Sequence, residues 1–217
     1  MDADDVELRV LGCLLEKQRT TPDHYPLTLN ALRLACNQTT NRDPIVAYDE
    51  REIQEALQRL SRRGWTRVAS GPGSRAAKYR QLFDEALGLA PDETALLCVL
   101  MLRGPQTPGE LKQRTERLHR FESLADIFDT LARLGERGLV ERLERRPGQK
   151  EERYRHLLGR EAPTDAARGT PAPALAAPSA APADDLAGRV GALEREVAEL
   201  RAALAELRSS ADVRADA

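Results

Sequence analysis

The chain contains one segment twice, and any fold must accommodate both copies. Arg63-Gly64-Trp65 aligns with Arg137-Gly138-Leu139, which follows 74 positions later. Residues 78–83 align with residues 153–158 at an offset of 75. Upstream of the glycines the apolar residues keep the offset of 74, so that Ile53, Leu57 and Leu60 align with Ile127, Leu131 and Leu134. Because the offset changes only between predicted elements, we interpret the two segments as copies of one structural unit.

Each copy predicts three helices followed by two short strands. The third helix places apolar residues at i, i+4 and i+7 and ends at a glycine, Gly64 or Gly138, which suits the left-handed residue beyond a helix end. Strand-like residues then flank a Gly/Pro turn, as in a β-hairpin. In the second copy, Thr107-Pro108-Gly109-Glu110 and Ser123-x-x-Asp126 are typical of helix N-termini.

Three helices that end in a β-hairpin follow the order of a winged helix-turn-helix. We therefore predict a mainly α, α+β chain with two tandem winged helix-turn-helix domains, residues 1–86 and 87–160. The alternative is a pair of generic α+β domains without a shared topology. The repeated ending of glycine, strand, turn and strand disfavours that alternative.

The C-terminal part of the chain changes composition. Residues 161–184 are rich in proline and alanine and hold few side chains for a core to bury, so we predict a disordered linker. Residues 185–209 carry a heptad pattern, which predicts a coiled coil and a parallel homodimer. The alternative is a lone amphipathic helix packed on the chain's own domains. The predicted dimer seam consists of Leu186, Val190, Leu193, Val197, Leu200, Leu204 and Leu207.

Composition excludes several classes of protein. The N-terminus is acidic, and the longest apolar run, residues 95–102, is much shorter than the roughly 20 residues of a membrane helix. We expect a cytoplasmic protein without a membrane partner. The widely spaced Cys13, Cys36 and Cys98 are expected to be reduced core residues. A three-cysteine zinc site is the alternative, but no ligand spacing supports it, and we predict no metal and no cofactor.

Basic residues gather in the first copy, although the whole chain has a net charge of −2. Residues 51–83 hold eight basic and two acidic residues, whereas residues 123–157 hold eight and seven. This contrast predicts a phosphate-binding face for duplex DNA. On the third helix, Gln54, Gln58, Arg59 and Arg62 lie off the apolar stripe and should face outward. The candidate DNA-binding residues are Arg51, Gln54, Gln58, Arg59, Arg62, Arg63, Arg67, Arg75, Lys78 and Arg80.

Two observations weigh against DNA binding. The third helix begins with Asp49-Glu50-Arg51-Glu52, which is acidic where a recognition helix meets the groove. Arginine outnumbers lysine 29 to 4, so the basic face is alternatively a solvated surface of an arginine-rich chain. The competing function is a protein-docking adaptor that uses the winged helices, above all the near-neutral second unit, or the coiled coil.

We predict no catalytic residue and a non-enzymatic protein. His24, His119 and His156 are scattered, and the sequence contains no phosphate-binding glycine motif and no HExxH motif. The polar loop of residues 20–44 is expected to cap helices and satisfy its own backbone. Alternatively, that loop lines a small-molecule or partner site, with Arg42 as an anion anchor.

Five stretches of the chain are distinctive: residues 11–18 (LGCLLEKQ), 20–27 (TTPDHYPL), 35–44 (ACNQTTNRDP), 102–111 (LRGPQTPGEL) and 146–151 (RPGQKE). They closely resemble the YceH family of bacterial proteins. The heptad segment at the C-terminus also looks like the tail of that family. The resemblance implies tandem winged-helix domains in the bacterial cytoplasm, and it supplies no catalytic residues to carry over.

Overall fold

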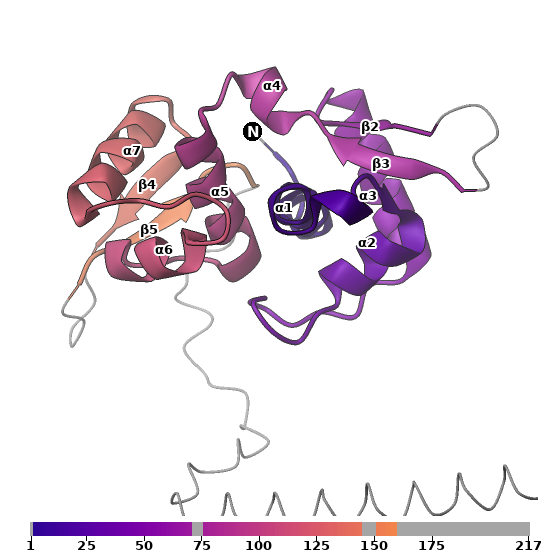
Figure 1. Ribbon diagram of the computed structural model, residues 1–217, viewed down its shortest axis with the longest axis horizontal. Helices are drawn as coiled ribbons and strands as arrows, with labels where there is room; N and C mark the ends of the chain where they lie inside the picture. The colour runs from indigo at the N-terminus through magenta and orange to yellow at the C-terminus, as the bar shows by residue number, and fades with distance from the viewer. Residues whose placement is uncertain (1, 71–75, 145–150, 160–217) are drawn as a thin grey trace, which may run out of the picture. The chain divides into compact units, whose positions relative to one another are not determined.

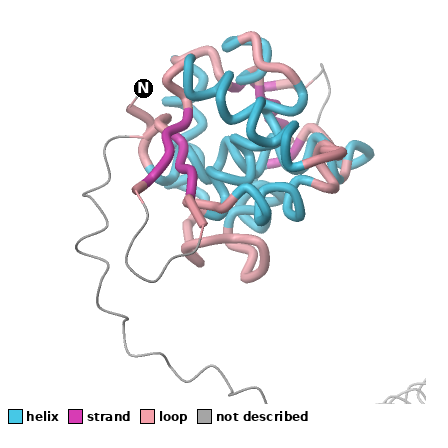
Figure 2. The backbone as a smooth tube through the Cα atoms, turned by 90° about the vertical axis from the view of Figure 1, so that its left-hand side faces the viewer, coloured by secondary structure: helices cyan, strands magenta, loops and turns pink. Residues whose placement is uncertain are grey.

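The computed structural model describes residues 2–70, 76–144 and 151–159, which all lie in one compact unit. This part is mainly helical and holds two small antiparallel sheets, which confirms the predicted α+β, mainly α class. The two hairpins lie on opposite sides of a pair of central helices (Figure 1). Figure 2 shows that helices make up most of the described chain. The predicted linker, 161–184, and coiled coil, 185–209, lie outside the described residues.

The first half is built from three main helices and a three-stranded sheet. The strand order is β1-β3-β2, with β3 antiparallel to both neighbours. Tyr79 of β3 is the partner of Leu27 on one side and of Val68 on the other. The elements are α1 (Asp5–Thr20), the 3-10 turn η1 (Pro22–His24), β1 (Leu27–Thr28), α2 (Leu29–Cys36), α3 (Glu50–Arg62), β2 (Thr66–Val68) and β3 (Lys78–Gln81).

The second half repeats this order after a short connecting helix. Its hairpin is antiparallel, and Gln106 forms an isolated bridge to Tyr154 where the first half has a short strand. The elements are α4 (Phe83–Leu87), α5 (Pro91–Arg103), α6 (Pro108–Thr115), α7 (Leu124–Glu136), β4 (Val140–Leu143) and β5 (Arg153–His156).

Equivalent hydrogen bonds close the third helix in both halves. Trp65 N donates to Leu60 O at 2.9 Å, and Leu139 N donates to Leu134 O at the same distance. The glycines between them, Gly64 and Gly138, have φ of 74° and 65°, so a residue without a Cβ is favoured there. The sequence repeat is therefore also a repeat of local structure.

Side-chain caps begin the helices where the sequence predicts them. Glu110 N donates to Thr107 Oγ1 at 3.2 Å, and Asp126 N donates to Ser123 Oγ at 3.2 Å. In both caps the acidic side chain accepts the N–H of the capping residue in return. Each reciprocal pair satisfies two backbone donors that a helix N-terminus leaves free, which confirms the predicted starts of α6 and α7.

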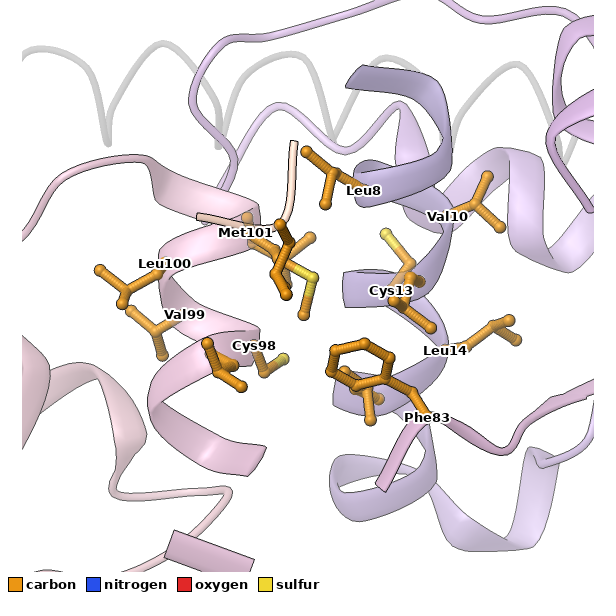
Figure 3. Packing of buried hydrophobic residues seen from close by; sticks show 14 of the residues in the cluster. Leu8, Val10, Cys13, Leu14, Phe83, Cys98, Val99, Leu100 and Met101 are labelled. Carbon is orange, nitrogen blue, oxygen red and sulfur yellow. The ribbon is translucent and has the colours of Figure 1, made fainter. Parts of the chain in front are cut away.

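Two helices, α1 and α5, pack against each other at the centre of the unit. Residues 7–15 of α1 and 93–102 of α5 are all buried, as expected of helices that are covered on every side. Figure 3 shows Cys98 and Met101 pointing from α5 towards α1, while Val99 and Leu100 point to the opposite side of α5. The first helix of each half therefore belongs to a core that the two halves share.

Close approach of the two central helices depends on Gly12. A Cβ at this position would lie 2.9 Å from Leu102 Cγ, which is too short for an unstrained contact. Cys98 Sγ also donates to Gly12 O at 3.4 Å.

The predicted domain boundary between residues 86 and 87 falls inside α4 and stays a prediction. Cys13, Cys36 and Cys98 are free and buried, as expected of core cysteines.

Candidate nucleic-acid interface

The outward face of α3 is the first part of the candidate interface. Ile53, Ala56, Leu57 and Leu60 are buried, and this stripe holds the helix against the core. Gln54, Gln58 and Arg62 lie on the opposite side and are exposed, which confirms their predicted orientation. Arg62 Nε donates to the carbonyl of Gln58 at 3.4 Å.

The start of α3 is acidic because it is a capping box. Glu52 N donates to Asp49 Oδ1 at 2.8 Å, and Asp49 N donates to Glu52 Oε2 at 2.8 Å. Arg51 Nε donates to Glu55 Oε1 at 2.9 Å one turn further along. The acids at this end stabilise the helix N-terminus and leave a negative potential there.

The hairpin of β2 and β3 is the second part of the interface. Arg67 lies directly opposite Arg80, so two like charges share one position of the ladder. Arg80 Nη2 donates to Glu85 Oε1 at 2.7 Å, while Arg67 and Lys78 are exposed. Arg75 lies outside the described residues.

Arg59 and Arg63 contact acidic residues at the start of α1. Arg59 Nη2 donates to Asp4 Oδ2 at 2.7 Å, and Arg59 Nε lies 3.7 Å from Glu7 Oε2. Arg63 Nε donates to Glu7 Oε1 at 3.3 Å. The side chain of Glu7 is only 2% exposed, and a buried carboxylate needs such partners. The prediction that Arg59 faces outward is therefore wrong, since Arg59 is one-third exposed and holds α3 against α1.

The second half has the same arrangement. Arg137 Nη1 donates to Glu93 Oε2 at 3.0 Å, and Arg133 contacts both Glu93 and Asp92 at the start of α5. Burial disfavours the charged form of Asp92, but hydrogen bonds from Thr130, from the N–H of Glu93 and from Arg133 outweigh it and lower the Asp92 pKa. Arginines at these two repeated positions therefore join the third helix to the first in both halves.

The ten predicted residues therefore fall into different groups. Arg59 and Arg63 are structural, Arg51 and Arg80 have acidic partners, and Arg75 is not described. In the part of the chain that the structure describes, Arg62, Arg67 and Lys78 form no ion pair. With the amides of Gln54 and Gln58, these three cations are the groups that remain free to donate to phosphate or to base edges.

Arg42 of the polar loop is fully engaged inside the protein. Its five N–H groups donate to the carboxylate of Glu16, the side chain of Gln38 and the carbonyls of Ala35 and Asn41. Its side chain has no exposed surface, and the Glu16 contact at 2.5 Å raises its pKa against the opposing effect of burial. The alternative in which Arg42 anchors an external anion is therefore wrong, and the loop is held to α1 by this residue.

Two other side chains of the polar loop, those of Tyr25 and Asn37, also form hydrogen bonds within the protein. Tyr25 Oη accepts the backbone N–H of Gln81 at 2.7 Å, and burial raises the pKa of Tyr25 to about 12. Asn37 forms two hydrogen bonds with the backbone of Tyr48. The loop therefore satisfies its own backbone and its neighbours, as the first interpretation expects.

Sequence analysis missed the acidic partners of the arginines. Asp4 and Glu7 lie outside the window in which charges were counted, and they neutralise part of the excess found there. A signal for this was present, because Arg59 and Arg63 recur as Arg133 and Arg137 at the offset of 74. Charged residues that a near-neutral second copy repeats are candidates for a structural role.

No metal site or membrane span appears in the described ranges. Within 2–70, 76–144 and 151–159, no group of three or more His, Cys, Asp or Glu side chains is placed to hold a metal ion. None of the helices in these ranges combines the length and the apolar character needed to cross a bilayer.

The described chain is thus a mainly helical α+β protein whose first half presents a basic hairpin beside a polar helix face. The family model described as "Protein of unknown function, DUF480" matches residues 3–149, and the chain belongs to this family. It is 47% identical over 205 residues to a UPF0502 protein of Solibacter usitatus, covering 94% of this chain and 96% of the relative. It is 44% identical over 208 residues to the UPF0502 protein YceH of Escherichia fergusonii, covering 93% and 94%. The resemblance to the YceH family is confirmed.

Proposed function

We propose that the chain is a tandem winged helix-turn-helix protein whose first unit, residues 1–86, binds duplex DNA. Support comes from the order helix, short strand, helix, helix and hairpin in the first half, and from its repetition in the second half with a bridge in place of the short strand. In a helix-turn-helix protein the recognition helix enters the major groove, which assigns that role to α3.

The observation that carries this proposal is the set of cations without acidic partners in the described part of the first half. Arg67 and Lys78 of the hairpin are assigned to the phosphate backbone, where exposed cations release condensed counterions. Gln54, Gln58 and Arg62 recur at i, i+4 and i+8 on α3 and are assigned to base edges and the groove wall. The acidic first turn of α3 repels phosphate, so contact is assigned to the middle and end of the helix.

The test is fluorescence anisotropy with a mixed-sequence duplex over about 50 to 200 mM salt. The two assigned phosphate contacts, Arg67 and Lys78, predict a slope of log K against log salt of about −2, since each contact contributes roughly −0.9. Arg67→Glu combined with Lys78→Glu should weaken binding at low salt by at least about tenfold and flatten the slope by about 2.

A matched control keeps the same change in net charge. Arg117 and Arg120 are exposed in the second half, and Arg117→Glu with Arg120→Glu should leave DNA binding within about twofold of wild type. Absence of binding by the wild-type chain at low salt contradicts the proposal. If both double variants lost the same amount of DNA affinity, the assignment of phosphate contacts to the first hairpin would be contradicted.

We further propose that the protein acts in the bacterial cytoplasm, without catalysis, as a homodimer joined by the heptad seam of residues 186–207. Two weak DNA-binding units in one dimer bind with an effective concentration that exceeds that of separate units. This avidity compensates for the small number of free cations in each first unit.

A further inference from the structure

The third helix of the second half is equivalent to α3 but carries a different outward face. Phe128 occupies the position of Gln54, and Leu124 occupies that of Glu50, both at the repeat offset of 74. Further along the same face, Gln58 is replaced by Ala132 and Arg62 by Glu136. The replacements that make this face apolar are Glu50 by Leu124, Arg51 by Ala125, Gln54 by Phe128 and Gln58 by Ala132.

The outward face of α7 is an apolar stripe that no described residue covers. The side chains of Leu124 and Phe128 are each 47% exposed, and Ala125 and Ala132 are exposed beside them. Residues at i, i+1, i+4 and i+8 lie along one strip of a helix, so the four side chains form a continuous surface. Alanines beside a phenylalanine leave room for the backbone of another helix to approach, as small residues do in helix packing.

Acidic residues border this stripe. Asp129 and Glu136 are exposed at i and i+7 along its edge, and no ion pair to either is present in the described ranges. A hollow of about 250 Å³ lies on the neighbouring flank of α7, next to the start of α5, and its walls include Glu122, Asp126 and Asp129. The arginines there are engaged, since Arg133 contacts Asp92 and Arg120 lies 3.7 Å from Glu116.

We propose that this face of α7 (Leu124, Ala125, Phe128 and Ala132) docks an amphipathic helix of a partner protein whose apolar side is flanked by lysine or arginine. The apolar stripe supplies burial, and the carboxylates of Asp129 and Glu136 select a basic flank. This inference goes beyond DNA binding and does not depend on it, because it uses the other half of the unit.

Charge separates this occupant from two others. The heptad segment of this chain, residues 185–209, carries five acidic and four basic residues, so it does not complement the acidic edge. A second copy paired antiparallel through α7 would bring the edge with Asp129 and Glu136 against the same edge of its partner. Like charges in such an interface cost free energy.

The probe is a fluorescent peptide of about 18 residues, or five helical turns, with leucines on one face and lysines on both flanks. The full chain should bind it, and Leu124→Glu with Phe128→Gln, which restores the residues of α3, should weaken binding at least about tenfold, a factor worth 1.4 kcal/mol. Both positions are exposed, so the variant should keep its melting temperature. A peptide of the same composition with scattered leucines should bind at least tenfold more weakly than the first.

Two further variants test the surface and the charge. Leu34→Gln with Ile45→Gln removes exposed apolar side chains from the first half and should leave peptide affinity unchanged. Asp129→Arg with Glu136→Arg should weaken binding of the leucine-lysine peptide and strengthen binding of a leucine-glutamate peptide with the same pattern. Equal binding of the two charge types by the wild type would overturn the proposal.

The remaining outcomes concern the other occupants. Binding of a synthetic 185–209 peptide that is lost in Leu124→Glu with Phe128→Gln would assign the face to this chain's own tail. Loss of a dimer in light scattering with the same variant would assign it to a second copy. Either result would overturn the assignment to a basic partner helix, whereas retained DNA binding in that variant would show that the two proposals are independent.

Discussion

The imidazole of His156 is held neutral at the end of β5. Burial and the neighbouring Arg155 lower the pKa of His156 from 6.5 to about 4, against a smaller opposing effect of Asp5. Its Nδ1 accepts the N–H of Leu158 at 3.4 Å. The carbonyl of Leu158 in turn accepts the N–H of Ala3 at 3.1 Å, so this residue lies where the start of the first half meets the end of the second.

Acid is therefore expected to destabilise the protein through His156. The unfolded chain binds this proton near pH 6.5 and the folded chain near pH 4, so between these values the unfolded state holds more protons. The free energy of unfolding should fall by about 1–3 kcal/mol as the pH is lowered through this range. The glutamine side chain of the His156→Gln variant does not titrate, so the free energy of unfolding of this variant should fall less over the same pH range. Urea unfolding at several pH values measures the difference. If the free energy of unfolding depended on pH in the same way in both proteins, the lowered pKa of His156 would be contradicted.

The partner of Arg42 could not be predicted from the residues around it in the sequence. The polar composition of its loop predicts that these side chains satisfy local backbone, and Asn37 and Tyr25 do so. The sequence does not reveal that Glu16, 26 positions away, meets the Arg42 guanidinium. This pair forms only because α1 packs against the loop in the tertiary structure.

At the scale of elements, the local signals are accurate. Helix ends at Gly64 and Gly138, the caps at Thr107 and Ser123, and the hairpins after each third helix all follow from short-range sequence patterns. Each of these depends on residues that are close together in the sequence. The packing of α1 against α5 was not predicted, because both helices are buried on every side and the spacing of their apolar residues does not indicate which element each one packs against.

Contact between those helices makes Gly12 sensitive to size. Gly12→Val should lower the free energy of unfolding by about 1–3 kcal/mol, because the added atoms overlap Leu102 and Met101 in a packed core. Gly109→Ala is the control, since Gly109 is exposed in α6 and the nearest atom to an added Cβ is 4.0 Å away. That variant should be neutral or up to about 1 kcal/mol more stable by chemical unfolding. Equal stability of Gly12→Val and wild type would contradict the tight contact.

At the scale of the whole molecule, the distribution of charge differs between the two halves. Both use a pair of arginines to join the third helix to the first, and both end in a hairpin. The outward faces of their third helices have diverged, one polar and one apolar. Divergence on the outside of a shared framework fits two halves that contact different partners.

Self-association is predicted to reside in the heptad segment, outside the described residues. Deletion of residues 184–217 should convert a dimer to a monomer in multi-angle light scattering, because the seam at Leu193 and Leu200 is removed. Leu193→Glu with Leu200→Glu in the full chain should give the same mass without shortening it. An unchanged dimer in both proteins would show that another surface holds the copies together.

The sequence by itself determined the repeat, the helix caps and glycine ends, the apolar stripes and the family, because each is written in patterns of neighbouring residues or in long matching stretches. The tertiary structure decided which arginines are free. Arg59 and Arg63 meet Asp4 and Glu7 across more than 50 positions, and Arg67 meets no acidic side chain in the described chain. Ion pairing depends on distance in space, and only the packing of α3 against α1 brings these charges within reach of each other.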